Sequence, residues 1–483
     1  MTRSSNANAN SAAHARRSPA GLADAPGAIA LVALNAGYAH ASLALRCVKA
    51  SLGEDAERAV ILEFDSQFSP MQIAEKILAA QPATIGFSVY IWNVEAVAAV
   101  MRIVRAARPE IRLVVGGPQI VQGEDREGIQ ALADEAFFGE IERRPAAAAR
   151  PVSAGAPYRL YTDEDIAHRV IYAETSRGCP FHCEYCSSAA DPDGIRFFPP
   201  GEILPEFGAL IERGARSFKF LDRSFNIGGE NPLAALDFFL AKWRDGMRLH
   251  FEFTPDPLDE KWREKLRRFP PRALHIEVGI QTFNPEVARR IKRPLHPARA
   301  EETLRFLTLD AKAAVHADLI AGLPGETLDS FARGFDRLLA LAPDELQAGI
   351  LKNLPGSAIA RHDAEFSVRW SPLPPYQILE NRDIPFAQMR ALERFSKCWD
   401  TLYNSGRFRG AARLLWRDGA SAFNRVWELA EQIYVANGKM HGISPKRLAS
   451  TLLEHLVERC GILESEAKSA LERDARESAW RNS

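Results

Sequence analysis

The sequence predicts an α/β chain in three parts: a doubly wound parallel sheet, a partial (β/α)6 barrel and an α-helical C-terminal region. Two stretches of alternating strand and helix patterns, separated by a proline- and alanine-rich break, indicate parallel sheets. The strand signal fades from Trp370 onward. The predicted parts are a disordered tail (1–27), the doubly wound domain (28–142), a linker (143–160), the barrel (161–369) and the helical region (370–483).

The doubly wound domain is predicted from short apolar runs with helical patterns between them. The expected strands are Ile29–Leu34, Ala59–Phe64, Thr84–Tyr90, Arg112–Pro118 and a short Ala136–Phe138. The expected helices are Ser42–Leu52, Met71–Ala80 and Val94–Ala107. Ligands of such sheets bind beyond the carboxyl ends of the strands. The candidate ligand loops are therefore 35–40, 88–93 and 116–119.

Six further strand patterns predict the barrel, with helical patterns such as Pro232–Trp243 and Leu328–Leu341 between them. The expected strands are Val170–Glu174, Ser217–Leu221, Leu249–Phe253, Leu274–Ile280, Ala314–Ile320 and Leu346–Leu351. The active site of a barrel lies at the carboxyl ends of its strands. The C-terminal region is expected to form helices over Phe386–Tyr403, Arg413–Asn437 and Pro445–Glu472.

Composition excludes several classes of protein. Hydrophobic residues make up 46% and charged residues 25% of the 483 residues, which is ordinary for a globular chain. The 61 basic and 62 acidic residues give a net charge of −1, so general nucleic-acid binding is not expected. No apolar run is long enough to span a membrane, and the N-terminus has no apolar core like that of a secretory signal. We therefore expect a cytoplasmic protein without a membrane partner.

Three of the six cysteines lie within eight residues, as Cys179, Cys183 and Cys186, just after the first barrel strand. Clustered thiolates suit zinc or an iron–sulfur cluster. Structural zinc would need a fourth ligand close by, and His182 lies awkwardly between two of the cysteines. An iron–sulfur cube held by three cysteines would instead leave one iron open to a ligand. A zinc knuckle remains the alternative.

This CxxxCxxC spacing, with Tyr185 before the last cysteine, resembles the signature of the radical S-adenosylmethionine (SAM) enzymes. The resemblance implies a [4Fe-4S] cluster whose open iron chelates the amino and carboxylate groups of SAM. Reductive cleavage of SAM then yields a 5′-deoxyadenosyl radical, so the cofactor supplies the chemistry and the protein the orientation. It also implies an electron donor such as flavodoxin or ferredoxin.

Other strand ends are similar to the SAM-binding positions of radical SAM enzymes related to the coproporphyrinogen dehydrogenases. The resemblance assigns Glu252 and Gln281 to the ribose or methionine part of SAM. It assigns Arg293 to the carboxylate and Asp318 to a ribose hydroxyl, in keeping with the donors and acceptors of these side chains. The alternatives are a salt bridge between Glu252 and Arg293 and a helix-capping role for Asp318.

The second barrel strand departs from this family. Many members end it with Gly-Gly-Glu, which binds the SAM amino group, whereas this chain has Leu221-Asp-Arg-Ser-Phe-Asn226. Asp222 is expected to cap the strand end, and Ser224 or Asn226 is a candidate substitute. Tyr185, Asp222 and Ser224 complete the expected SAM-binding set.

The domain order resembles the cobalamin-binding subclass of radical SAM enzymes over about residues 28–140. The usual Asp-x-His-x-x-Gly pattern is absent, and His40 occupies the corresponding loop at a different spacing. The expected cobalamin-binding residues are Asn35, Tyr38, His40, Ser88, Tyr90, Trp92, Asn93, Gly116, Gly117 and Pro118. The alternative is a vestigial domain that binds nothing. The segments 222–226, 370–376 and 402–408 are similar to a group of these proteins with an uncharacterised helical C-terminal domain.

The resemblance implies a cobalamin-dependent methyltransferase that acts on an unactivated carbon of a small molecule or peptide. The alternatives are a radical rearrangement, cyclisation or peptide modification without methyl transfer, and a non-catalytic cobalamin or iron–sulfur sensor. Methylthiolation of tRNA is disfavoured, because those enzymes carry extra N-terminal cluster cysteines and here only Cys47 precedes the triad.

Overall fold

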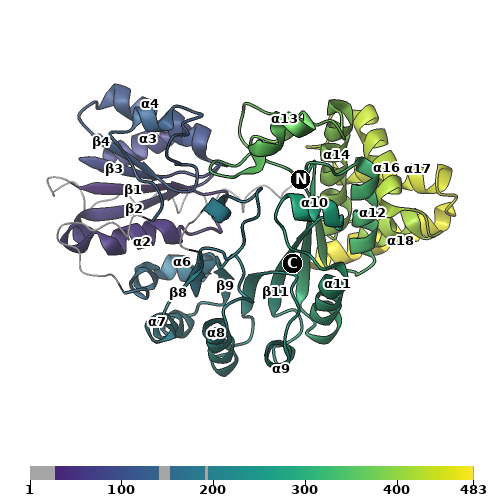
Figure 1. Cartoon of the computed structure of the whole chain (residues 1–483), viewed down its shortest axis with the longest axis horizontal. Coiled ribbons are helices and arrows are strands. Elements are labelled where there is room, and N and C mark those ends of the chain that lie inside the picture. The colour runs from purple at the N-terminus through teal and green to yellow at the C-terminus, as the bar shows by residue number, and fades with distance from the viewer. Residues whose placement is uncertain (1–27, 141–152, 191–193, 482–483) are drawn as a thin grey trace, which may run out of the picture. The chain divides into compact units, whose positions relative to one another are not determined.

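A computed structural model describes residues 28–140, 153–190 and 194–481 of the chain (Figure 1). The chain divides into two compact units. The first comprises residues up to Ala173 together with Phe198–Phe218, and the second comprises Glu174–Phe197 and the chain from Lys219 onward. The predicted tail (1–27) and residues 143–152 of the predicted linker lie outside the described residues.

A five-stranded parallel sheet with the order β2-β1-β3-β4-β5 forms the centre of the first unit. Its strands are β1 (Ile29–Leu34), β2 (Ala59–Phe64), β3 (Thr84–Ser88), β4 (Arg112–Gly116) and β5 (Glu135–Ala136). The helices between them are α2 (Leu43–Ser51), η1 (Gly53–Arg58), α3 (Pro70–Ala79), α4 (Val94–Ala107) and α5 (Ile129–Leu132). The strand order reverses between β1 and β3, so the ligand crevice of such a sheet is expected at their carboxyl ends.

Both faces of this sheet are buried, because its strands carry apolar residues at consecutive positions. On one face Val32 belongs to the same core cluster as Ile77 of α3 and Met101 of α4. On the other face Leu31 clusters with Leu45 of α2. Helices on both faces confirm the predicted doubly wound architecture (Figure 1).

The described end of the predicted linker is folded rather than extended. Residues 156–160 form the short helix η3 (Ala156–Leu160), because its apolar side chains are buried. Tyr158 packs edge-on against Phe207 of α7 (Pro200–Glu212), with ring centroids 4.8 Å apart. Helix α6 (Asp163–His168) and strand β6 (Ile171–Ala173) follow.

A six-stranded sheet with the sequential order β13-β12-β11-β10-β9-β6 confirms the predicted partial barrel. The strands after β6 are β9 (Ser217–Phe220), β10 (Arg248–Phe253), β11 (Leu274–Gln281), β12 (Ala314–Ala321) and β13 (Glu345–Ile350). The helices between them are α8 (Glu230–Ala241), α9 (Glu260–Arg267), α10 (Pro285–Arg290), α11 (Pro297–Arg305), the π-helical turn η5 (Phe306–Asp310) and α12 (Leu328–Leu339). Parallel pairing is recorded from β10 through β13.

Side chains of these strands alternate strictly between an apolar and a polar face. In β11, for example, Ile276 and Val278 are fully buried, whereas His275 and Glu277 on the opposite face are half-buried. The same alternation places His250 and Glu252 of β10, and His316 and Asp318 of β12, on the polar face. The inner face of the barrel is therefore lined with ionisable side chains.

The C-terminal region is helical, as predicted, but the stretches expected as single helices over Arg413–Asn437 and Pro445–Glu472 are each divided. Its helices are α14 (Phe386–Trp399), η7 (Asp400–Asn404), α15 (Arg409–Ala412), η8 (Arg413–Trp416), α16 (Ala422–Asn437), α17 (Pro445–Glu458) and α18 (Glu464–Arg481). The single helix expected over Pro445–Glu472 is two helices. Gly461, at φ 65°, turns the chain between them, a conformation that favours glycine.

Short elements occupy several loops of the second unit. They are β7 (Ser176–Arg177), η4 (Ser187–Ala190), β8 (Arg196–Phe197), η6 (Ile359–His362), α13 (Asp363–Phe366), β14 (Arg369–Trp370) and β15 (Ile378–Glu380). Within the described parts of the chain, no helix is long and apolar enough to cross a lipid bilayer.

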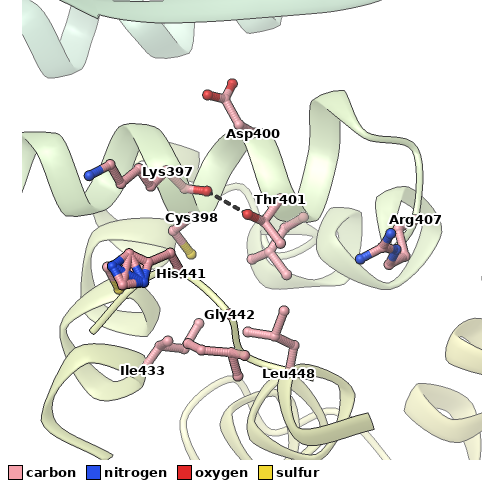
Figure 2. Close-up of a pocket in the computed structure, with 12 residues that line it drawn as sticks. Lys397, Cys398, Asp400, Thr401, Arg407, Ile433, His441, Gly442 and Leu448 are labelled. Atoms are coloured by element: carbon pink, nitrogen blue, oxygen red, sulfur yellow. Dashed lines mark hydrogen bonds between the residues drawn. The ribbon is translucent and has the colours of Figure 1, made fainter. Parts of the chain in front are cut away.

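A pocket of about 370 Å³ lies among the C-terminal helices (Figure 2). Its lining combines polar side chains such as Lys397, Asp400 and His441 with the apolar Ile433 and Leu448. All of its lining residues come from 397–448, so the C-terminal region forms this pocket by itself.

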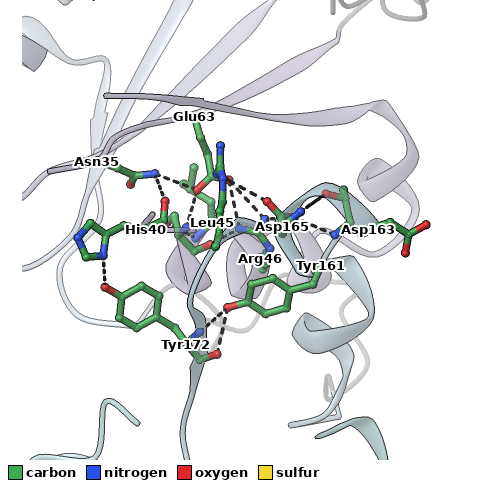
Figure 3. A network of polar contacts seen from close by, with 12 residues as sticks. Asn35, His40, Leu45, Arg46, Glu63, Tyr161, Asp163, Asp165 and Tyr172 are labelled. Carbon is green, nitrogen blue, oxygen red and sulfur yellow. Dashed lines mark hydrogen bonds and ion pairs between the residues drawn. The ribbon is translucent and has the colours of Figure 1, made fainter. Parts of the chain in front are cut away.

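Four charged side chains form a buried network in the first unit (Figure 3). Arg46 of α2 lies 2.7 Å from Asp165 of α6 and 3.4 Å from Glu63 of β2, measured between side-chain nitrogen and oxygen atoms. Arg169 contacts the same two carboxylates, at 2.9 Å from Glu63 and 3.6 Å from Asp165. The arginines also lie over aromatic rings, Arg46 over Tyr161 and Arg169 over Tyr38. The network joins α2 and β2 to the helix that precedes the first barrel strand.

Replacement of Arg46 by alanine is expected to destabilise the first unit by about 3 kcal/mol, because it leaves buried carboxylates short of a counter-charge. Urea unfolding followed by tryptophan fluorescence and circular dichroism measures this. The control is Arg58→Ala, which breaks an exposed pair with Asp55 and should change stability by less than about 0.5 kcal/mol. Equal effects of the two substitutions would contradict a structural role for the network.

Candidate active site at the cysteine loop

The three clustered cysteines lie on one short loop between β7 and η4. Cys183 is buried, Cys179 and Cys186 are half-buried, and none of them forms a disulfide. The Cys186 amide donates a hydrogen bond to the Cys183 carbonyl at 3.1 Å, which makes the loop compact. His182 is exposed on the same loop. Three reduced thiols on one loop fit a cube of iron and sulfide that has a fourth, open iron.

Glu184, inside the cysteine loop, is buried and surrounded by positive charge. Its carboxylate lies 2.6 Å from Arg361 Nη2, 2.7 Å from His362 Nε2 and 3.3 Å from Lys292 Nζ. Its own amide donates to the carbonyl of Ile291 at 3.0 Å. The loop is thus held by two segments far away in sequence. Sequence reasoning missed Glu184, although a carboxylate between two clustered cysteines was a visible signal.

Two arginines place positive charge beside the thiols. Arg293 Nη1 lies 3.9 Å from Cys183 Sγ, and its Nη2 donates to the Gly279 carbonyl at 2.5 Å. Burial raises the pKa of the Cys183 thiol, and the Arg293 charge opposes that rise. Sequence reasoning also missed Arg223. The negative charge of Glu252 raises the pKa of the Arg223 guanidinium most, and the charges of Cys186 and Cys179 add to this effect. This positive surround favours thiolates and a bound anionic cluster.

Asp222 is tied to the chain that leads into the cysteine loop. The residue is fully buried, and its carboxylate accepts hydrogen bonds from the Thr175 amide and hydroxyl and from the Ser176 hydroxyl. Its burial raises its pKa to about 6. These bonds tie the end of β9 to the chain after β6, in keeping with the predicted strand-capping role, and the predicted contact of Asp222 with SAM stays a prediction. Ser224 is close to the loop, since its Oγ lies 3.7 Å from Cys179 Sγ.

The other predicted SAM-binding residues lie on the polar face of the barrel strands. Glu252 pairs with Arg223 at 3.7 Å, not with Arg293 as the alternative proposed. Asp318 lies 2.9 Å from His316 within β12 and caps no helix. Tyr185 lies near Arg293 and Cys183, and its burial raises its pKa well above the usual value. Roles for these side chains in binding SAM remain predictions.

Gln281 ends β11 in a strained conformation. Its φ of 70° is rare for a residue with a side chain, and the pairing of β11 with β12 shifts register between Gly279 and Gln281. A Cβ at Gly279 would overlap Nε2 of Gln281, so a side chain there would displace the Gln281 amide. The Oε1 atom of Gln281 is buried without a hydrogen-bond partner among the described residues. This orphaned acceptor at a strand end fits a ligand that donates a hydrogen bond.

Glu326 is a third residue that sequence reasoning missed. It follows β12 and is buried, and its Oε1 accepts hydrogen bonds from the hydroxyls of Thr282 at 2.8 Å and Ser330 at 3.1 Å. Its Oε2 has no hydrogen-bond partner among the described residues. Burial raises the pKa of Glu326 to about 7.

In the first unit, the predicted cobalamin loops come together at the carboxyl ends of β1, β3 and β4. Tyr90 and Trp92 stack with ring centroids 4.3 Å apart, and Trp92 is 58% exposed. Gly117 has a φ of 113°, and a Cβ there would lie 2.6 Å from the Val89 carbonyl oxygen. A side chain is therefore excluded where the backbone turns, as expected for a surface that a flat ligand approaches closely.

Several of the predicted cobalamin residues have partners within the unit. Asn93 donates to the carbonyls of Leu34 and Ser88 at 3.0 and 3.1 Å, so it ties the ends of β1 and β3 together. Asn35 donates to the His40 carbonyl and to Glu63, and Tyr38 donates to Glu164. The side chain of His40 lies 2.7 Å from the Tyr172 hydroxyl. These contacts give Asn35, Asn93 and His40 structural roles, and their contact with cobalamin remains a prediction.

Replacement of Glu184 by alanine should weaken iron retention, because the cysteine loop loses the carboxylate that holds it to Lys292, Arg361 and His362. The expected effect is roughly a 10- to 100-fold faster loss of iron to a chelator, as for other residues that orient metal ligands. Iron counting after anaerobic reconstitution and timed chelation measures this. Glu286→Ala, an exposed glutamate of α10, is the matched control and should retain iron like the wild type. Equal rates for both variants would refute the anchoring role.

Glu326→Gln should change how stability depends on pH. The pKa of Glu326 is about 7 in the folded chain and 4.5 in the unfolded chain, so the folded chain keeps a proton that the unfolded chain releases near pH 4.5. The protonated Glu326 therefore stabilises the fold by about 3 kcal/mol at low pH, and this contribution is lost as the pH rises through 7. The variant has no such proton. Its melting temperature relative to wild type should therefore rise between pH 5 and pH 8. Parallel melting profiles of the two proteins would contradict the raised pKa.

Comparisons with solved structures show where this fold occurs. The radical SAM methyltransferase TsrM from Kitasatospora setae, solved with cobalamin and a [4Fe-4S] cluster, superposes with a TM-score of 0.56 at 15% identity, over 94% of this chain and 100% of TsrM. The cobalamin-dependent SAM radical enzyme OxsB superposes with a TM-score of 0.57 at 12% identity, over 94% and 83% of the two chains. At these identities the likeness shows the fold.

Curated relatives match at low identity. The ribosomal protein uS12 methylthiotransferase RimO from Citrifermentans bemidjiense is 25% identical over 192 residues, which is 37% of this chain and 43% of RimO. A tRNA-2-methylthio-N(6)-dimethylallyladenosine synthase from Chloroflexus aurantiacus is 23% identical over 279 residues, 54% of this chain and 59% of that protein. The chain thus matches about half the length of these relatives.

Three family matches follow the three architectural parts. Residues 29–149 match the B12 binding domain, residues 173–338 the Radical SAM superfamily, and residues 364–476 a protein family of unknown function, DUF4080. The first two matches support the three cofactors expected from the sequence: a [4Fe-4S] cluster, SAM and cobalamin. The chain therefore belongs to the radical SAM enzymes that carry a cobalamin-binding domain.

Proposed function

We propose that this cobalamin-dependent radical SAM enzyme is a methyltransferase that acts on an unactivated carbon of a small molecule or peptide. The observation that carries the proposal is the combination of a B12 binding domain with a three-cysteine radical SAM loop in one chain. When bound, the cluster and SAM supply a 5′-deoxyadenosyl radical, and cobalamin supplies a carrier for the methyl group. The protein's own contribution is then to hold, orient and shield these groups.

The residues that would hold SAM follow from their positions. Arg293 forks its two terminal nitrogens toward Cys183 and Gly279, beside the thiols, where it can also meet a carboxylate. The buried Oε1 of Gln281 accepts a hydrogen bond from a SAM amino or hydroxyl group. Glu252, paired with the half-exposed Arg223, accepts from the ribose. Ser224, next to Cys179, takes over the amino-group contact that Gly-Gly-Glu makes in other members.

The residues that would hold cobalamin lie at the strand ends of the first unit. Trp92 and Tyr90 offer a stacked aromatic surface, and Gly116 and Gly117 let the backbone approach a flat ring system. Because His40 is engaged with Tyr172, we propose that no side chain of this loop ligates the lower face of cobalt.

The methylthiotransferase relatives suggest methylthio transfer as an alternative reaction. The small number of cysteines before the triad argues against that reaction. Those enzymes carry additional N-terminal cluster cysteines, whereas Cys47 alone precedes the triad here. Cys47 is buried in α2 beneath the sheet of the first unit, in a helix that packs on β1 and β2. Methyl transfer needs no second cluster. We further propose a cytoplasmic enzyme reduced by a flavodoxin or ferredoxin.

The proposal is tested by anaerobic reconstitution with iron, sulfide and cobalamin, followed by reduction with SAM and mass analysis of the products. Methyl transfer predicts both 5′-deoxyadenosine and S-adenosylhomocysteine. Deoxyadenosine alone would favour rearrangement or another radical modification without methyl transfer. Neither product from a protein that binds four irons and cobalamin would favour a sensor.

Cys183→Ala should abolish both products, with a loss greater than about 1,000-fold, because two thiolates cannot hold the cube with a single open iron. Liquid chromatography with mass detection measures deoxyadenosine and S-adenosylhomocysteine in the same reaction. The matched control is Cys460→Ala, a cysteine of the C-terminal region outside the loop, which should retain iron and both products. Unchanged deoxyadenosine formation by the Cys183 variant would contradict the assignment.

A further inference from the structure

A second set of metal-binding side chains lies on the polar face of the barrel sheet, near the amino ends of the strands. His275 is the second residue of β11, His316 the third of β12 and Glu345 the first of β13, on three adjacent strands. Gln281, at the carboxyl end of β11, is six residues beyond His275, or about 20 Å along a strand. The three side chains therefore lie apart from Gln281, and Asp318, a predicted SAM-binding residue, lies between the two levels on β12.

The geometry of this set approaches that of a metal site. One ligand atom from each of His275, His316 and Glu345 lies within 4.8 Å of the other two. One pair, His316 Nδ1 and Glu345 Oε2, is already 3.5 Å apart. Bonds of about 2.0–2.1 Å in a tetrahedral site place ligand atoms roughly 3.4 Å from one another. Small side-chain rotations would therefore bring all three atoms onto one ion.

Asp318 is placed to orient one of these ligands. Its Oδ1 lies 2.9 Å from Nε2 of His316, the ring nitrogen that faces away from Glu345. Both atoms are buried, and neither makes a hydrogen bond within the described part of the chain, so a small rotation of one side chain would align the pair. Metal-bound imidazoles usually donate their other ring N–H to a carboxylate placed in this way.

The side chains around His275, His316 and Glu345 carry negative charge that favours a cation, and the site is open to solvent. The carboxylates of Glu277, Asp318 and Glu345 all act on His316 and give this end of the sheet negative charge. His250 stacks on His275 at a centroid distance of 4.5 Å, and its Nε2 lies 3.3 Å from Glu277. The Glu345 side chain is 42% exposed, so an ion can reach the site from solvent.

We propose that His275, His316 and Glu345 bind one divalent transition-metal ion, with Asp318 orienting His316 and a fourth position open to water. Two imidazoles and one carboxylate suit Zn²⁺ among the common ions, and three protein ligands leave one position of a tetrahedron free. The ion ties together three strands of the barrel. The proposal does not depend on methyl transfer, and its test uses no product of SAM.

The test uses the full chain after anaerobic reconstitution, so that iron occupies the clustered cysteines. Zn²⁺ is titrated by calorimetry, and zinc and iron are then counted after removal of excess metal. Wild type should bind one Zn²⁺ in addition to its iron. His316→Ala and His275→Ala should bind Zn²⁺ at least tenfold more weakly with unchanged iron, and Asp318→Asn should weaken it about 10- to 100-fold. His250→Ala, which removes the neighbouring histidine outside the set, should retain zinc.

Two results would overturn the proposal. One is wild-type protein that binds no zinc, and the other is zinc binding that the His275, His316 and Asp318 variants leave unchanged. If an alanine variant melts far below wild type without metal, its zinc binding is not a fair test. The ligands of Co²⁺ in the wild-type protein then show whether the ion lies at the proposed site. X-ray absorption at the cobalt edge of this cobalamin-free protein should show nitrogen and oxygen neighbours, and cobalt–sulfur scattering would place the ion on cysteines instead.

Discussion

The buried carboxylate of Glu184 is the constraint on which the cysteine loop depends. A loop of eight residues with three thiols has no regular secondary structure of its own to hold it. Glu184 lies inside it, among Lys292, Arg361 and His362, and its amide is bonded to Ile291. The Glu184 side chain is only 1% exposed, so these partners have to compensate the loss of water around its carboxylate. The loop is thus held by contacts that the protein itself supplies.

Charge on the polar face of the barrel is arranged in two levels along the strands. Near the carboxyl ends, Arg293, Gln281 and Glu252 provide a donor and acceptors for a zwitterionic ligand. Nearer the amino ends, histidines alternate with carboxylates and compensate one another. The apolar face of the same strands packs against helices and leaves these ionisable groups to the interior. A single two-residue periodicity therefore produces both the barrel core and its polar interior.

The strands could be predicted from the sequence because their apolar residues follow recognisable patterns, a continuous run in Ile29–Leu34 and an alternation in Ala314–Ala321, with helical patterns between the strands. The cysteine loop could be predicted because the spacing of soft ligands is visible in the sequence. The partners of Glu184 could not be predicted, because Arg361 and His362 lie more than 170 residues away in the sequence. Asp222 could be assigned to a strand end, but its complete burial depends on Thr175 and Ser176 across the sheet. Gly461, which divides the last predicted helix, was a readable signal.

The central claim is that three thiolates hold a cluster whose open iron takes the amino and carboxylate groups of SAM. Pulsed electron paramagnetic resonance of the reconstituted and reduced protein tests it most directly, with SAM labelled by ¹⁵N in its amino group or ¹⁷O in its carboxylate. The account predicts hyperfine coupling of both labels to the cluster spin. A reduced cluster that binds SAM yet shows no coupling to either label, or a preparation that holds no iron, would contradict it.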